Sequence, residues 1–245
     1  MPQRLIVAIT GASGAIYGIR ILETLALDKS IETHLILSPA GRATIAQETP
    51  YSAKEVEALA TVVHPPANIG ASIASGSFET MGMIVAPCSI KSLSAIANCF
   101  SADLVARAAD VQLKEGRPVV LMVRETPLHK GHLRLMTEAA DNGAIIMPPV
   151  PAFYGNPKSL DDLVNATVGR ALARVGIHNQ LYSEWLGMSN PAAPTPATGP
   201  QPPAIDPSTP PVPPVPASTG TPPPRQTRRR LTPRTPVGKI PGAPR

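Results

Sequence analysis

The sequence predicts an α/β protein whose open, mostly parallel sheet is covered by helices on both faces. The first observation is an alternation of apolar, β-rich runs with helical patterns over about the first 190 residues. The second is that a turn rich in Gly, Ser or Pro follows each apolar run. Strands that alternate with helices in this way pair in parallel, because each helix carries the chain back across the sheet.

Five strands and seven longer helices follow from these patterns. The strands are predicted at residues 5–10, 32–37, 81–86, 118–123 and 144–147. The helices are predicted at residues 14–27, 40–48, 53–60, 89–98, 103–115, 131–141 and 159–175, with a short terminal helix at 180–188. The last long helix has the clearest boundaries, with Ser159 as N-cap and Gly176 just beyond its end.

The composition divides the chain into a body, residues 1–189, and a tail, residues 190–245. Nineteen of the 31 prolines lie between residues 191 and 245. The tail has a net charge of +6 and the body −1, so the basic pI belongs to the tail. A segment of Pro, Ala, Thr and Gly buries too little apolar surface to offset its ordering entropy. We expect one globular domain followed by a disordered tail with polyproline II character.

Several function classes are disfavoured by the composition. A near-neutral body argues against nucleic-acid binding, which usually requires a basic patch within the domain. The first residues lack the features of a signal peptide, and no apolar run is long enough to span a bilayer. The two cysteines, Cys88 and Cys99, form no CxxC pair, which is typical of a reduced protein. We therefore expect a cytoplasmic protein without nucleic-acid or membrane partners.

The most distinctive turns all follow predicted strands. In chain order they read TGASGA, SPAG, PCSIKS, RETPL and PPVPAFY. The turns that follow parallel strands share the carboxyl edge of a sheet, where ligands bind. Five segments that are distant in sequence are therefore expected to be neighbours in space.

The first of these turns favours a mononucleotide. Gly11–Ala15 leads from a strand into a helix, and its small residues let backbone N–H groups approach an anion. It lacks the third glycine of GxGxxG, and Ser38 replaces the acidic residue that would close the second strand of a dinucleotide site. A plain tight turn is the alternative interpretation.

The segment RAADVQLKEGRPVVLMVRE combines three cations with a carboxylate. Arg107 and Lys114 are seven residues apart, which is two helical turns, so they point the same way. Arg124 and Glu125 follow an apolar strand. Gathering these charges at one strand end is costly unless a ligand needs them. A phosphate is the expected ligand, with the carboxylate left for proton transfer.

Other polar residues have ordinary structural explanations. Ser89 and Ser92 cap a helix or contact a ligand. Cys88 is interpreted as a core residue rather than a nucleophile. His129 and His132 suggest a polar loop rather than a metal site, because no third ligand is evident.

Tyr154 and Arg170 also have plain alternatives. Taken singly, they would be a tyrosine at the rim of the ligand edge and a surface arginine on the last helix. The acidic pair Asp161-Asp162 is explained by helix capping and does not form the repeated carboxylate motif that binds magnesium.

Together the motifs resemble the UbiX/Pad1-type flavin prenyltransferase family over about residues 4–187. The strings that carry the resemblance are ITGASGAIYGIRILE, SPAG, IASGSFETMGMIVAPCSIKSLSAIA, RAADVQLKE, RETPLHKGHLRLM and PPVPAFY. Each string is moderately specific, and their common order and spacing make the resemblance highly specific.

The resemblance implies a Rossmann-like or flavodoxin-like three-layer fold that binds FMN. It implies transfer of a dimethylallyl group from dimethylallyl monophosphate to N5 and then C6 of reduced FMN, without a metal. The prenylated FMN would serve a separate UbiD-type decarboxylase. A homo-oligomer is also implied, as a dodecamer with its sites at subunit contacts.

Residue roles follow from the same resemblance. The residues that would bind FMN are Gly11, Ala12, Ser13, Ser38, Ser89, Ile90, Lys91, Ser92 and Arg124. Those that would surround the prenyl phosphate are Arg107, Lys114, Arg124, Tyr154 and Arg170. The catalytic residues would be Ser13, Glu48, Glu125 and Lys114. Ser13 and Glu48 would relay protons near N5, Glu125 would act beside the departing phosphate, and Trp185 would cover the site.

Two alternatives remain. A flavin-dependent cysteine decarboxylase would carry a PxSANT-like segment where this chain has PCSIKS, and its histidine context is missing around His64. A non-catalytic FMN-binding subunit of a decarboxylase complex would not need the complete set of Glu48, Lys114, Glu125 and Arg170. The donor could also be a diphosphate.

Overall fold

The computed structural model describes residues 3–185 and residue 187. The predicted tail at 190–245 lies outside the described residues, as does part of the predicted terminal helix. The strands are β1 (Gln3–Ile9), β2 (Ile31–Leu37), β3 (Val62–His64), β4 (Gly82–Cys88), β5 (Val119–Val123) and β6 (Ile145–Ile146). The helices are α1 (Ala15–Ala26), α2 (Pro39–Glu48), α3 (Ala53–Ala58), α4 (Ile90–Ala97), α5 (Leu104–Lys114), α6 (Lys130–Asp141) and α7 (Leu160–Arg174), with a 3-10 helix at Ser72–Ala74.

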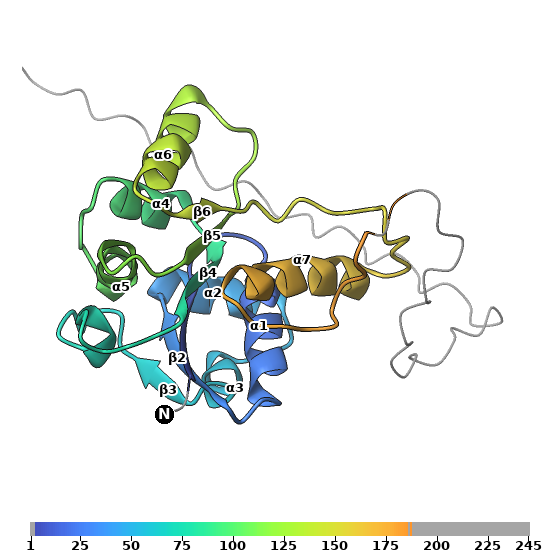
Figure 1. Cartoon of the computed structure of the whole chain (residues 1–245), viewed down its shortest axis with the longest axis horizontal. Coiled ribbons are helices and arrows are strands. Elements are labelled where there is room, and N and C mark those ends of the chain that lie inside the picture. The colour runs from blue at the N-terminus through green and yellow to red at the C-terminus, as the bar shows by residue number, and fades with distance from the viewer. Residues whose placement is uncertain (1–2, 186, 188–245) are drawn as a thin grey trace, which may run out of the picture. The chain divides into compact units, whose positions relative to one another are not determined.

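The six strands form one parallel sheet in the order β3-β2-β1-β4-β5-β6, which confirms the predicted fold class (Figure 1). From β1 the chain adds strands toward one side, and it then returns to place β4 on the other side of β1. The turns after β1 and β4 therefore lead to opposite faces. Such a switch point leaves a crevice at the carboxyl edge of the sheet.

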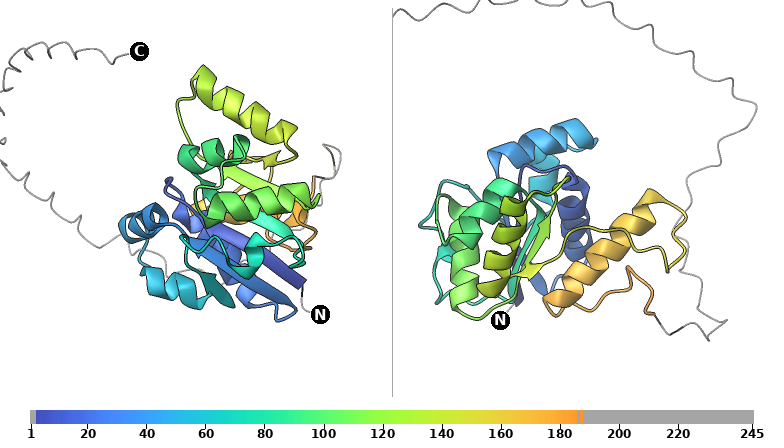
Figure 2. Two further views of the ribbon diagram at one scale, coloured as in Figure 1. Left: turned by 90° about the vertical axis from the view of Figure 1, so that its left-hand side faces the viewer. Right: turned by 90° about the horizontal axis from the view of Figure 1, so that it is seen from above.

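Helices cover both faces of the sheet, as Figure 2 shows. Helices α4, α5 and α6 bury their apolar side chains against one face, and α1, α2, α3 and α7 against the other. The strands supply both cores by alternation. In β1, Ile6 and Ala8 face the first core, and Leu5 and Val7 face the second. This explains the continuous apolar runs in the sequence, because a strand covered on both faces needs apolar residues at every position.

The boundaries predicted for the last long helix are confirmed. Ser159 accepts a hydrogen bond from the Asp162 N–H at 3.1 Å, and the Asp162 carboxylate accepts one from the Ser159 N–H at 3.0 Å. This capping box is worth on the order of 1 kcal/mol. Gly176 has a φ of +80°, the left-handed conformation that ends many helices.

Three elements differ from the prediction, and one of them is the 3-10 helix at Ser72–Ala74, which was not expected. Strand β3 was not expected, because it has only three residues at the sheet edge and Val63 is exposed. The terminal helix is wrong over residues 181–185, which are not helical. There the Asn179 side chain donates to the Gly169 carbonyl at 2.9 Å and accepts the Leu181 N–H at 3.1 Å. These contacts hold the segment against α7 and take the place of a helical pattern.

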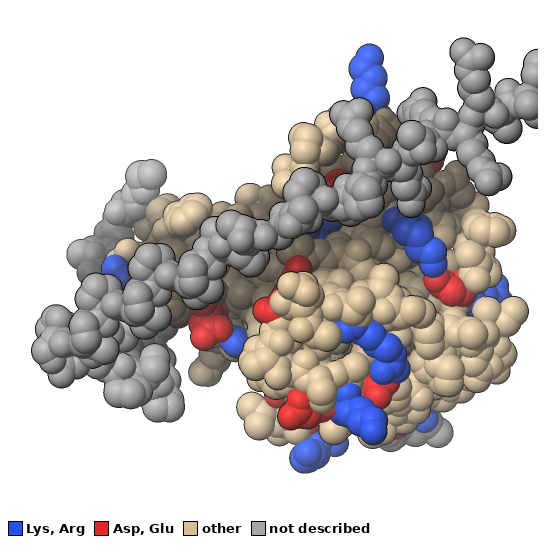
Figure 3. Space-filling view, turned by 180° about the vertical axis from the view of Figure 1, so that it is seen from behind, with Lys and Arg blue, Asp and Glu red and all other residues tan. Residues whose placement is uncertain are grey.

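Charged side chains are mixed on the face shown in Figure 3, where blue and red groups lie side by side over the described part of the surface. Two of the ion pairs are Lys91 with Asp103 and Arg107 with Asp110. None of the helices within the described residues is long and apolar enough to cross a membrane.

Candidate active site

The turns after β1, β4 and β5 are bonded side by side at the carboxyl edge. The Thr10 hydroxyl donates to the Pro87 carbonyl at 2.7 Å and accepts the Ser89 N–H at 2.8 Å. The Arg124 N–H donates to the Cys88 carbonyl at 3.1 Å. The structure therefore confirms that these distant segments share one edge, at the switch point of the sheet.

The glycine turn runs close against the start of α2. A Cβ atom on Gly11 would lie 2.3 Å from the Cβ of Ala40, so no larger residue fits there. Gly14 has a φ of +99°, which favours glycine. Ser38 caps α2 by accepting the Gly41 N–H at 3.0 Å. These features bring two ligand-edge turns together and leave Ser13 exposed.

Glu48, the last residue of α2, occupies the N-terminus of α1. Its Oε2 accepts the Gly14 N–H at 2.8 Å and the Ala15 N–H at 3.2 Å. Burial raises the pKa of Glu48, but hydrogen bonds from Ser13, Gly14 and Ala15 and the charge of Arg124 outweigh it, so the pKa lies below its usual value. Glu48 is therefore ionised. The chain's own carboxylate therefore accepts two of the N–H groups that the sequence suggested for a bound anion.

Arg124 lies near both Glu48 and Tyr17, and its positive charge acts to lower the pKa of each group. For Tyr17 burial is the larger effect, and the pKa of the phenol is raised. No carboxylate of the described residues forms an ion pair with Arg124. Glu125 is exposed beside it and accepts the Thr126 N–H at 3.0 Å. Sequence reasoning missed Tyr17, although its place in the first turn after the glycine motif was a usable signal.

The turn after β4 presents hydroxyl groups. Ser89 accepts the Ser92 N–H at 3.3 Å and lies at the N-terminus of α4. Lys91 turns its ammonium group toward Asp103 at the start of α5. Cys88 is fully buried, and burial raises the pKa of its thiol to about 12. It therefore stays a neutral core residue, as expected.

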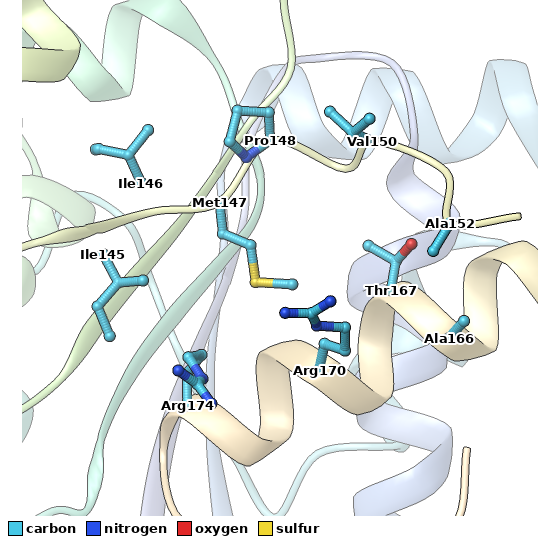
Figure 4. Close-up of a pocket in the computed structure, with 10 residues that line it drawn as sticks. All are labelled: Ile145, Ile146, Met147, Pro148, Val150, Ala152, Ala166, Thr167, Arg170 and Arg174. Atoms are coloured by element: carbon cyan, nitrogen blue, oxygen red, sulfur yellow. The ribbon is translucent and has the colours of Figure 1, made fainter. Parts of the chain in front are cut away.

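A hollow of about 370 Å³ lies between β6, the segment after it and α7 (Figure 4). Its lining residues are Ile145, Ile146, Met147, Pro148, Val150, Ala152, Ala166, Thr167, Arg170 and Arg174. The two arginines are one helical turn apart, and neither forms an ion pair with the described residues. Arg174 was missed by sequence reasoning, although its i,i+4 spacing from Arg170 was visible. An apolar wall with two cations suits a small anionic amphiphile.

Tyr154 and Trp185 come together although 31 positions separate them in the sequence. Their ring centroids are 5.6 Å apart with an interplanar angle of 76°, which is an edge-to-face contact. Both side chains are about half exposed. The proposed lid therefore lies beside one of the proposed phosphate ligands.

Arg107 and Lys114 lie apart from Arg170 within one chain. They lie on α5, which covers the opposite face of the sheet from α7. Lys114 precedes β5 and Arg124 follows it, so the strand separates them by about 13 Å or more. Arg107 pairs with Asp110 at 2.8 Å. The prediction of three cations at one strand end is thus wrong for Lys114 within a single chain, because α5 leads into the start of β5 rather than its end.

Two histidine pairs lie elsewhere. His129 caps α6 by accepting the Gly131 N–H at 3.0 Å, and its ring centroid is 3.7 Å from that of His132. His34 and His64 are buried, with 2.9 Å between the Nδ1 of the first and the Nε2 of the second. Over residues 3–185 and 187, no group of three or more His, Cys, Asp or Glu side chains is arranged to hold a metal.

Comparisons with known proteins identify the family of this chain. Residues 1–172 match the Flavoprotein family model. The flavin prenyltransferase UbiX of Escherichia coli strain K12 is 58% identical over 187 residues, which cover 76% of this chain and 99% of the relative. A solved dodecameric FMN-dependent UbiX-like decarboxylase from Escherichia coli O157:H7 is 46% identical with a TM-score of 0.74, over 76% of this chain and 100% of that chain. AnUbiX (PadA1), solved in complex with FMN and dimethylallyl pyrophosphate, is 46% identical with a TM-score of 0.75, over 77% of this chain and 100% of that chain. The sequence agreement over the whole described region, together with the shared fold, means that this chain belongs to the UbiX/Pad1 family of flavin prenyltransferases.

Proposed function

We propose that residues 1–189 form a flavin prenyltransferase that moves a dimethylallyl group from dimethylallyl monophosphate to N5 and C6 of reduced FMN. The observation that carries the proposal is the position of Arg124. This exposed cation has no ion-pair partner among the described residues and lies near ionised Glu48, at the carboxyl edge beside the turn after β4. The 58% identity to a UbiX relative supports the same reaction.

The residues of the turns at the carboxyl edge fit FMN. The close approach at Gly11 leaves a turn without bulky side chains, and Ser38 and Ser89 place hydroxyl groups at the same edge. Arg124 adds a charge suited to a phosphate. FMN would be held by these residues with Ala12, Ser13, Ile90, Lys91 and Ser92. When bound in its reduced form, FMN supplies an electron-rich acceptor for the allyl group.

The chain's own groups have distinct tasks in this proposal. Ionised Glu48 accepts a hydrogen bond from Ser13, so the pair can take up and pass on a proton beside N5. Breaking the allylic ester bond puts charge on the leaving phosphate. Arg124 and Arg170 stabilise that charge, and Tyr154 donates a hydrogen bond to it. Glu125 would accept or donate a proton beside the phosphate, and the Trp185 ring would limit access of water.

Arg107 and Lys114 are proposed to complete the phosphate site of a neighbouring copy in a homo-oligomer. Within one chain the sheet separates them from Arg170. The Lys114 side chain is 49% exposed, and its partner Glu115 is the next residue. The solved UbiX-like relative is described as dodecameric, which supports an assembly of many copies.

The product, prenylated FMN, is proposed to serve a UbiD-type decarboxylase. The free thiols of Cys88 and Cys99 support a reducing, cytoplasmic setting. The AnUbiX structure contains dimethylallyl pyrophosphate, so a diphosphate donor is to be tried beside the monophosphate.

The test is an anaerobic incubation of the protein with reduced FMN and dimethylallyl monophosphate, followed by mass spectrometry of the flavin. We expect a flavin carrying one prenyl group. Bound but unmodified FMN would indicate a non-catalytic subunit. Decarboxylation of a peptide with a C-terminal cysteine would indicate the other alternative. A boiled sample and one without donor are the controls.

A further inference from the structure

Arg20 connects two helices that carry different parts of the proposed site. It lies on α1, and its side chain is only 19% exposed. Its Nε donates to Glu23 at 2.9 Å, one terminal nitrogen donates to Asp161 at 2.8 Å, and the other donates to Asn165. Burial lowers the pKa of this guanidinium, but its bonds to Asp161 and Glu23 outweigh that effect and raise the pKa. Arg20 is therefore a fixed cation with every nitrogen bonded.

The first turns of α7 have little else to hold them. Leu160 is 81% exposed, and the buried residues of the helix begin only at Val164. The segment that precedes α7, residues 147–159, contains no helix or strand. The bonds from Arg20 to Asp161 and Asn165 are thus the main polar attachment of this half of α7 to α1.

The two helices that Arg20 connects, α1 and α7, both carry parts of the proposed active site. Helix α1 starts at the glycine turn, where Glu48 holds its first N–H groups. Helix α7 carries Arg170, and Tyr154 lies in the segment just before it. Glu23 also accepts a hydrogen bond from Tyr51, three residues after Glu48, which ties the end of α2 into the same network. A shift of α7 would therefore change the distance between the flavin turn and the groups that bind the donor.

We propose that Arg20 is a positioning residue for the donor phosphate, holding α7 where Arg170 meets the leaving group. Arg20 itself touches neither the flavin nor the donor. The inference rests on the proposed prenyl transfer. Arginine suits this place better than lysine, because its planar fork reaches three separate acceptors at once, whereas the donors of lysine share one nitrogen atom.

The test uses Arg20→Met, which keeps the apolar stem and removes the fork. We expect the affinity for FMN to stay within about 2-fold and the KM for dimethylallyl monophosphate to rise about 10-fold or more, because small displacements of positioning groups are costly. The double variant Asp161→Ala, Asn165→Leu should show the same split. Arg20→Lys should restore part of the donor affinity.

Arg42→Met is the matched control. It breaks another ion pair between helices, Arg42 with Glu57, which has no contact with α7. We expect its KM for the donor to match that of the unmodified protein. Amide hydrogen exchange over residues 160–166 gives a readout that does not depend on activity, and only Arg20→Met should make it faster.

The outcomes separate the two proposals. An unchanged donor KM in Arg20→Met, or a parallel loss of FMN and donor affinity, would overturn the positioning role. Unchanged exchange over residues 160–166 would overturn it as well. A chain that prenylates no flavin would disprove the proposed function, whereas the exchange experiment would still show whether Arg20 holds α7.

Discussion

Two inactive variants should restore activity to each other if neighbouring copies share a phosphate site. In a single chain, Lys114 lies on α5 and Arg170 on α7, on opposite faces of the sheet. Lys114→Ala and Arg170→Ala would then each remove a different half of every site. An oligomer assembled from both variants would contain some sites in which one copy supplies Lys114 and its neighbour supplies Arg170.

The size of the recovery follows from counting. With equal amounts and random assembly, half of the copies carry Arg170 and half of the neighbours carry Lys114, so about a quarter of the sites are complete. Each variant alone should lose on the order of 100-fold or more in turnover, because one group that stabilises developing charge is worth about 3 kcal/mol. The mixture should therefore be roughly 25-fold more active than either variant.

The assay is the yield of prenylated FMN from oligomers purified through two different tags, one on each variant. Both variants alone should still bind FMN. The control mixture pairs Lys114→Ala with a chain carrying both substitutions, and it should not recover, because no copy supplies Lys114. If doubly tagged oligomers of the two single variants stay as inactive as each variant alone, the idea of a shared site is wrong.

Three further predictions concern charge, pH and packing. Glu48→Gln should slow turnover about 10-fold or more while the FMN Kd changes less than about 3-fold, because the proton acceptor is lost but the turn remains. If a binding titration and a rate assay show equal losses of FMN affinity and turnover, Glu48 has a structural role instead. Burial lowers the pKa of His34 and of His64 below the usual value of about 6.5, so the folded state favours the neutral imidazoles. The resulting stability is present above that pH, and it is lost as the pH falls toward the pKa values of the folded state. As the pH falls, the free energy of unfolding should decrease by up to about 1.4 kcal/mol per pH unit for each histidine. Chemical denaturation at several pH values should show a weaker pH dependence for His34→Gln, but not for the exposed control His178→Gln. The same pH dependence in both variants would contradict the assignment. Gly169→Ala places a Cβ atom 2.6 Å from the Asn179 side chain and should lower the free energy of unfolding by about 1–3 kcal/mol, which a lower Tm would report. The control Gly155→Ala has no atom within 4 Å of its Cβ and should leave the Tm unchanged. Equal Tm values for the two variants would show that the segment around Asn179 adapts without strain.

The sequence predicted the sheet well because its strands are buried on both faces. All five predicted strands and seven helices are present, and the unexpected β3 is too short to give a pattern. The prediction of the terminal helix was wrong because hydrogen bonds of the Asn179 side chain determine the conformation of that segment. Such hydrogen bonds leave no periodic pattern in the sequence.

The site was predicted only in part. Turns after strands had to meet at the carboxyl edge whatever the strand order, so the neighbourhood of Ser89 and Arg124 followed from alternation alone. The end of a strand to which a helix leads is not encoded in residue spacing, which is why Lys114 was predicted beside Arg124. The hydrogen bond from the Gly14 N–H to Glu48 joins positions 34 residues apart, so no local sequence pattern could predict it.

The carboxylate at the N-terminus of α1 has a consequence for how a ligand enters. Since Glu48 already accepts the N–H groups of Gly14 and Ala15, the end of the glycine turn is held by the chain's own groups before any ligand arrives. A turn that is ordered in advance lowers the entropy cost of association. The same two hydrogen bonds would keep this end of the turn in place after a ligand leaves, so that the next ligand meets the same surface.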